Sequence, residues 1–137
     1  IFGVSPGMRF HTAVNKFCWQ ASMGRPITVW NTAYYQKRPY LDLIDASRAI
    51  IHIIRNNIFD GRIYNILTQN STVEEVVKTI KDFIPNLEME FVEKKIMNQL
   101  SYEVSCDRFK STGFIFSGNL ERGIEETINL LKSANKD

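Results

Sequence analysis

The sequence is organised around one stretch, Gln36-Lys37-Arg38-Pro39-Tyr40-Leu41-Asp42-Leu43-Ile44-Asp45. Pro39 fixes its own φ and favours extended geometry at Arg38, so the guanidinium leaves the backbone from a rigid position. The alternation over Tyr40–Leu43 predicts a short strand, and Asp45 is the predicted N-cap of the following helix. A strand that runs straight into a helix, with an arginine at its start, suits an anionic ligand such as a diphosphate. The alternative is a surface arginine paired with a carboxylate.

The bulk composition excludes several classes of protein. The 137 residues fit one domain, and 44% hydrophobic and 23% charged residues are ordinary for a globular protein. The net charge is +2 without a basic block, so nucleic-acid binding is not indicated. The two cysteines and two histidines are scattered, at Cys18, Cys106, His11 and His52, which predicts neither a metal site nor a disulfide.

The sequence also bears on the location of the protein and on where the chain begins. No apolar run approaches the length of a membrane span and no signal peptide opens the chain, so we expect a cytoplasmic protein without membrane contact. The first residues, Ile1-Phe2-Gly3-Val4, read as the end of a strand without an initiator Met. We therefore expect a chain that begins inside a longer protein.

Hydrophobic periodicity predicts alternating helices and strands. Helices are predicted at about 12–23, from Asp45 onward, from Thr72 with Glu75 completing a capping box, at about 107–111, and from Asn119. Strands are predicted at Ile27–Trp30, Tyr40–Leu43, Ile63–Leu67 and Met89–Val92, with an extended segment at Leu100–Val104. Such alternation is typical of the α/β class.

The helix after Asp45 carries a regular apolar pattern. Its predicted buried stripe consists of Ala46, Ala49, Ile50, Ile53 and Ile54. Arg48, His52 and Arg55 are predicted to point away from that stripe, which makes His52 a surface residue rather than a catalytic one.

The motif Gln36–Ala49 resembles the Gln-x-Arg-Asp-[Phe/Tyr]-[Val/Ile]-x-Val-x-Asp pattern of the extended short-chain dehydrogenase/reductase family. These enzymes are NAD-dependent nucleotide-sugar epimerases and dehydratases. Further motifs follow in the family's order: Phe2-Gly3, Ile27-Thr28-Val29-Trp30, Ile63-Tyr64-Asn65-Ile66, Tyr102, Thr112-Gly113-Phe114 and Leu120-Glu121-Arg122-Gly123-Ile124. Together the matches span nearly the whole chain, and their agreement in order is more specific than any one of them.

The resemblance implies an α/β fold that forms the C-terminal part of a Rossmann-like enzyme. Residues 1–137 would be its substrate-binding portion, made of a small subdomain and the last strand or strands of the dinucleotide-fold sheet, among them Ile63–Leu67. The glycine-rich fingerprint and the Tyr-x-x-x-Lys catalytic residues would precede Ile1. We therefore expect no catalytic residue here and no NAD held by this portion, since the N-terminal half would bind it.

Five residues match positions that bind substrate in the family. Arg38 matches the arginine on the nucleotide diphosphate, and Thr28 and Trp30 match positions that hold the nucleobase. Tyr102 matches a tyrosine near the sugar, and Asn15 lies on the helix whose start supplies an asparagine to the phosphates. The expected partners are a nucleotide sugar, the N-terminal NAD-binding half of the same protein, and a second copy in a homo-oligomer.

The chain also departs from the family pattern. Pro39 replaces the usual acidic residue, and Leu100 stands where many members carry a second phosphate-binding arginine. That role would pass to Arg9, Lys16 or Lys37. Two hypotheses result: the substrate-binding half of a nucleotide-sugar enzyme, or a stand-alone binding or structural module that keeps the scaffold without catalysis.

Overall fold

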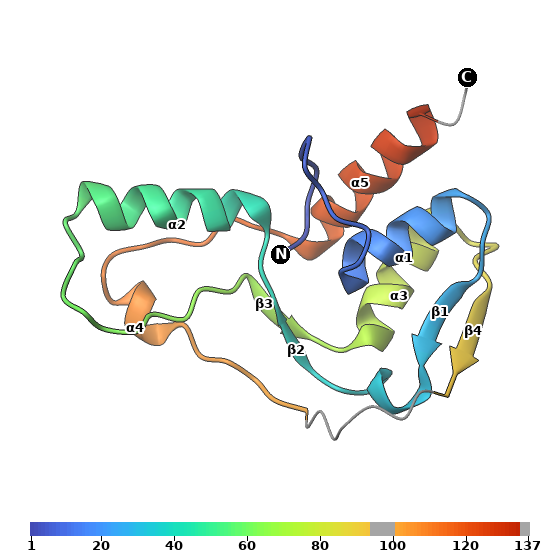
Figure 1. The fold of residues 1–137 in the computed structure, drawn as a ribbon, viewed down its shortest axis with the longest axis horizontal. Helices are drawn as coiled ribbons and strands as arrows, with labels where there is room; N and C mark the ends of the chain where they lie inside the picture. The colour runs from blue at the N-terminus through green and yellow to red at the C-terminus, as the bar shows by residue number, and fades with distance from the viewer. Residues whose placement is uncertain (94–100, 135–137) are drawn as a thin grey trace.

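The computed structural model describes residues 1–93 and 101–134 and has the predicted α/β alternation (Figure 1). In chain order its elements are α1 (Ala13–Ser22), β1 (Ile27–Trp30), the 3-10 turn η1 (Asn31–Ala33), β2 (Arg38–Tyr40), α2 (Leu43–Arg55), β3 (Gln69–Ser71), α3 (Val73–Phe83), β4 (Met89–Val92), α4 (Asp107–Lys110) and α5 (Leu120–Ala134).

Helices α1, α3 and α5 pack together beside a small parallel sheet of β1 and β4 (Figure 1). In this sheet Ile27 lies opposite Met89 and Trp30 lies opposite Val92. Apolar side chains from the three helices and β1 form the main core, because each helix is apolar on one face only. The predicted capping box is present, with Thr72 and Glu75 closing the start of α3.

The stretch from Gln36 to Asp45 joins this main body to α2. Strand β2 pairs antiparallel with β3, so that Arg38 lies opposite Ser71 and Tyr40 opposite Gln69. The backbone of Phe2 forms a parallel bridge to Asp42 just beyond β2. The Phe2 ring packs against Gly123 of α5, where a Cβ atom would lie 2.5 Å from the ring. This close approach explains a glycine inside a helix.

Helix α2 begins earlier than predicted. Its N-cap is Asp42, whose Oδ1 accepts from the backbone N–H of Ile44 at 2.9 Å, so the predictions of an Asp45 cap and of a strand over Tyr40–Leu43 were wrong. The strand ends at Tyr40 because the Asp42 side chain already serves the first turn of the helix. The signal was the spacing of the two acids, since an acidic residue three positions past an N-cap is favourable at a helix start.

The predicted buried stripe of α2 was right only in part. Ala49 is fully buried against Phe109 and Phe114 and Ile53 packs beside them, whereas Ile50 and Ile54 are 60% and 62% exposed. His52 lies on this inner face, in hydrogen-bond contact with Thr112 Oγ1 at 2.9 Å. The cause is that the segment around α4 packs against α2 through aromatic rings, which the imidazole can contact edge-on.

Residues 63–67 form no strand among the described residues, so this prediction was wrong for the chain as it stands. A strand needs a hydrogen-bonding neighbour, and side chains occupy that place here. Arg108 Nη1 donates to the Ile63 carbonyl at 2.9 Å, and Asn65 Nδ2 donates to the Ser105 carbonyl at 3.3 Å. Part of the extended segment predicted at Leu100–Val104 lies outside the described residues, and residues 101–104 form no strand either.

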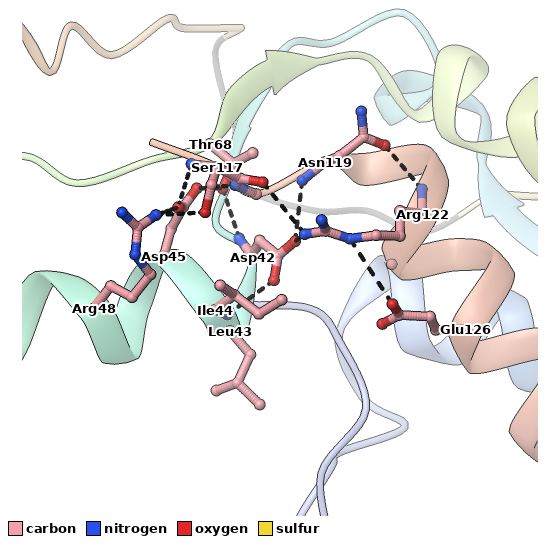
Figure 2. A network of polar contacts seen from close by, with 12 residues as sticks. Asp42, Leu43, Ile44, Asp45, Arg48, Thr68, Ser117, Asn119, Arg122 and Glu126 are labelled. Carbon is pink, nitrogen blue, oxygen red and sulfur yellow. Dashed lines mark hydrogen bonds and ion pairs between the residues drawn. The ribbon is translucent and has the colours of Figure 1, made fainter. Parts of the chain in front are cut away.

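Two buried carboxylates hold α2, the loop before α5 and α5 together (Figure 2). Asp45 is fully buried and accepts from the N–H groups of Ser117 at 2.9 Å and Gly118 at 3.0 Å and from Thr68 Oγ1 at 2.8 Å. Arg48 lies 3.6 Å from Asp45 Oδ1. Such a carboxylate is stable in the interior because its charge is paired and its lone pairs are used.

Asp42 plays the same role for α5. It is 3% exposed, and its Oδ2 accepts from the Asn119 N–H at 3.1 Å and from Arg122 Nη2 at 3.3 Å. The Asp45 carboxylate and the Asp42 side chain crowd Gly118, where a Cβ atom would lie 2.4 Å from Asp45 Oδ2 and 2.5 Å from Asp42 Cβ. Only glycine therefore fits between them without a shift of the backbone.

We expect Asp45→Ala to lower the free energy of unfolding by about 3–5 kcal/mol, because it leaves buried donors and Arg48 without their partner. Urea denaturation followed by circular dichroism measures the loss. Gly118→Ala should also destabilise, through the same contact with the carboxylate. The matched control is Asp82→Ala on the exposed side of α3, which should change stability by less than about 0.5 kcal/mol. A loss below about 1 kcal/mol for Asp45→Ala would contradict this role.

Candidate functional site

A cavity of about 250 Å³ lies between α1, β1 and β2. Its polar lining consists of His11, Lys16, Thr28, Gln36 and Arg38. The remaining lining is apolar or aromatic, with Trp30, Phe17 and Tyr40 the large rings. No carboxylate belongs to the lining among the described residues. Two cations beside aromatic rings make this a cavity suited to an anion that carries a flat ring.

The cavity brings together three of the five predicted site residues, Thr28, Trp30 and Arg38. Thr28 and Trp30 are two positions apart on β1 and so share one face of the strand. Arg38 begins β2, the next strand along the chain. The grouping follows from the fold, since β1 and β2 are connected by the η1 turn and a short loop.

Arg38 is held in place by neighbouring groups. Its Nη2 donates to Gln36 Oε1 at 2.7 Å and its Nη1 donates to the Lys37 carbonyl at 2.8 Å. The guanidinium also lies over the Tyr102 ring, 5.0 Å from its centroid. Arginine keeps its charge in any such setting and can grip phosphate oxygens at two points.

Tyr102 thus contacts Arg38 but does not itself line the cavity. Its segment is held beside β3 by a side chain, since the Asn70 amide both donates to the Val104 carbonyl and accepts from the Val104 N–H, each at 3.0 Å. Lys37 forms an ion pair with Glu103, and this hydrogen bond raises the pKa of Lys37.

Asn15 does not join the other site residues. It is buried, and its Oδ1 accepts from the Gly3 N–H at 3.4 Å, so it holds the N-terminal segment against α1. Asn15 lines a different cavity, together with Arg9. Of the three cations considered as replacements at Leu100, only Lys16 lines the cavity that contains Arg38. Leu100 itself lies outside the described residues.

Thr28 is positioned by Lys16, which was considered only as a phosphate ligand, and by Gln20, which was not predicted as a site residue. Lys16 Nζ and Gln20 Nε2 donate to Thr28 Oγ1 at 2.9 and 3.1 Å. Lys16 and Gln20 are four residues apart on α1, so they share the helix face that meets β1. Polar residues at that spacing beside an otherwise apolar stripe were the available signal.

Among the described residues, no thiol and no carboxylate lines this cavity. Burial raises the pKa of the Cys18 thiol to about 12, so it is protonated at neutral pH. In residues 1–93 and 101–134, no three His, Cys, Asp or Glu side chains are grouped as metal ligands. In the same residues, no helix has both the length and the apolar character to cross a membrane.

The comparisons with known proteins agree with the motifs. No protein-family model matches the chain. The chloroplastic UDP-sulfoquinovose synthase of Spinacia oleracea is 33% identical over 73 residues, which are 52% of this chain and 15% of that protein. The Thermus thermophilus UDP-glucose 4-epimerase in complex with NAD superposes with a TM-score of 0.77 at 19% identity, covering 96% of this chain and 44% of the epimerase. The Thermotoga maritima UDP-glucose 4-epimerase with UDP-glucose gives 0.74 at 18%, covering 96% and 43%.

The chain therefore has the α/β fold of one part of these epimerases, as the motifs from Gln36 onward predict. Its structural neighbours include NAD-dependent nucleotide-sugar epimerases and dehydratases. The chain spans less than half the length of these neighbours.

We expect Cys18 to resist thiol reagents in the folded protein, because its pKa of about 12 leaves almost no thiolate at pH 8. Peptide mapping by mass spectrometry after iodoacetamide treatment, with and without urea, measures this. Modification should need urea. The same shift predicts that Cys18 stabilises the fold fully below the pKa of the unfolded thiol, and that this stabilisation is lost as pH rises toward 12. Rapid modification without urea would contradict both expectations.

Proposed function

We propose that this chain is the substrate-binding half of an NAD-dependent nucleotide-sugar epimerase or dehydratase, and that the cavity between α1, β1 and β2 binds the nucleotide. The observation that carries the proposal is the meeting of Thr28, Trp30 and Arg38 at one cavity that has no carboxylate in its described lining. The relative from Spinacia oleracea acts on a UDP-sugar by its name, which favours a uridine nucleotide here.

The proposed roles follow from the chemistry of each group. Arg38 grips the diphosphate with its planar fork, and Trp30 offers a flat ring on which a base stacks. The Thr28 hydroxyl contacts the base, and Tyr102 lies near the sugar while its ring holds the Arg38 guanidinium. Asn15 has a positioning role, because its amide holds the N-terminal segment at Gly3.

Hydride transfer belongs to the other half of the proposed enzyme. This chain contains no Tyr-x-x-x-Lys sequence and no Gly-x-x-Gly-x-x-Gly sequence. The N-terminal half would hold NAD, which would supply reversible hydride transfer with the sugar. The residues of this chain orient the sugar for that step, and such orientation sets specificity.

The surface of α2 supports a separate N-terminal half as a partner. Four isoleucines, Ile44, Ile50, Ile51 and Ile54, lie between 41% and 62% exposed along this helix. Figure 1 shows α2 at the end of the molecule away from β1 and β4, so none of the main-body helices covers it. We infer that the dinucleotide-binding half covers these isoleucines in the whole enzyme, and that a second copy covers them when this chain is alone.

Arg38→Ala should weaken the binding of UDP-glucose by about 2–4 kcal/mol, because a charge-assisted contact with the diphosphate is lost. Arg38→Lys should recover only part of that loss, since a point charge does not reproduce the bidentate fork. Isothermal titration calorimetry on the folded variants gives the affinities. Arg55→Ala, at the exposed C-terminal end of α2, is the matched control. Equal affinities of wild type and Arg38→Ala would exclude a phosphate role.

The isolated chain should self-associate through α2, and the double variant Ile51→Asp/Ile54→Asp should be monomeric, because each aspartate disrupts an apolar contact. Sedimentation velocity separates the 15.9 kDa monomer from larger species. Leu130→Asp, which changes an exposed leucine of α5, is the control and should still associate. A wild-type chain that sediments as a monomer would contradict the proposal for this surface.

A further inference from the structure

The hydroxyl group of Thr28 has both lone pairs occupied from within the protein. Lys16 Nζ donates to Thr28 Oγ1 at 2.9 Å, and Gln20 Nε2 donates to the same oxygen at 3.1 Å. A threonine hydroxyl has two acceptor lone pairs and one proton, so the group is left only with its proton to offer. In residues 1–93 and 101–134, no acceptor takes that proton, and Thr28 lines the cavity.

The orientation of the Gln20 amide is fixed by the backbone of β1. The Thr28 N–H donates to Gln20 Oε1 at 3.4 Å, so the amide oxygen must face the strand. The amide nitrogen then faces the Thr28 hydroxyl and can only donate to it. Because Gln20 is buried, this arrangement has little freedom to reverse.

Lys16 also offers only hydrogen-bond donors to the cavity. Its ammonium group carries three donors and no acceptor, and one of them goes to Thr28. No carboxylate in the described part of the chain forms an ion pair with it. Lys16 and Thr28 therefore present to the cavity a surface made only of hydrogen-bond donors.

We propose that Lys16 and Thr28, with Gln20 as the positioning residue, select the nucleobase by the direction of its hydrogen bonds. This inference rests on the proposed function of the cavity. The discriminating position is C4 of the ring. Uracil carries an oxygen there, which accepts from Lys16 and Thr28, whereas cytosine carries an amino group there, which does not accept. Thr28 acts beside Trp30 on one face of β1, so the ring that stacks on Trp30 places its edge against Thr28.

Uracil and cytosine differ at this edge while their rings have nearly the same size. The shape of the cavity therefore contributes little to the choice between them, and hydrogen-bond direction decides it. An amino group set against Lys16 and Thr28 would leave donors facing donors without a partner, and such a mismatch in a half-buried site is disfavoured.

The test compares the dissociation constants of UDP and CDP by isothermal titration calorimetry for wild type and three variants. Wild type should bind UDP at least about tenfold more tightly than CDP, since one buried unpaired donor has that effect. In Lys16→Met the ratio should fall toward one. In Gln20→Glu the carboxylate cannot donate and instead accepts a hydrogen bond from the Thr28 hydroxyl. This leaves a lone pair of Thr28 Oγ1 free to accept from the base, so the ratio should fall or reverse. Arg38→Ala should weaken both ligands equally and keep the ratio.

The outcomes separate this inference from the proposed function. UDP and CDP affinities within about threefold in wild type would overturn the inference while leaving the nucleotide site intact. Equal weakening of both ligands in Lys16→Met would place Lys16 on the shared diphosphate and would also overturn it. If wild type binds neither nucleotide, the proposed function and the inference both fail. Circular dichroism confirms that each variant is folded.

Discussion

The structure depends on two buried carboxylates at the start of α2. Asp42 and Asp45 accept hydrogen bonds from backbone groups more than 70 residues further along the chain, and so they connect α2 to the loop before α5. Buried charges are costly unless all their partners are in place. The exclusion of any side chain at Gly118 follows from the same constraint. Because Asp42 follows β2 directly, the anchor also fixes the strand that carries Arg38.

The candidate site depends indirectly on these two carboxylates, because β2 connects them to Arg38. Strand β2 lies between the two carboxylates and the cavity. It pairs with β3 along its whole length, and the Phe2–Asp42 bridge holds the chain just beyond its C-terminal end, so Arg38 lies on a fixed element. Strand β1 is held by its pairing with β4 and by the contacts of α1. Sites on such elements keep their geometry better than sites built on loops, which suits a role in orienting a substrate.

Local signals in the sequence predicted much of the fold but only part of its arrangement. The limits of β1 and β4, the capping box of α3 and the grouping of Thr28, Trp30 and Arg38 follow from periodicity and motif order. The start of α2 was wrong because two aspartates compete for the cap, and only the tertiary partners of Asp45 decide between them. The exposed isoleucines of α2 and the unpaired Ile63–Leu67 segment depend on what packs against them, which periodicity does not contain. The Lys16–Gln20–Thr28 contacts join two elements, and sequence spacing alone does not place them together.

The Asn70 amide influences the candidate site from outside the cavity. Its two hydrogen bonds to Val104 imitate the pairing of a neighbouring strand, so one side chain substitutes for a backbone ladder. The position of Tyr102 against Arg38 therefore depends on Asn70, although Asn70 does not line the cavity. A substitution at Asn70 could therefore change the position of the Arg38 guanidinium while every residue that lines the cavity stayed the same. Divergence in ligand preference can then arise at a distance, without any change that a comparison of pocket residues would detect.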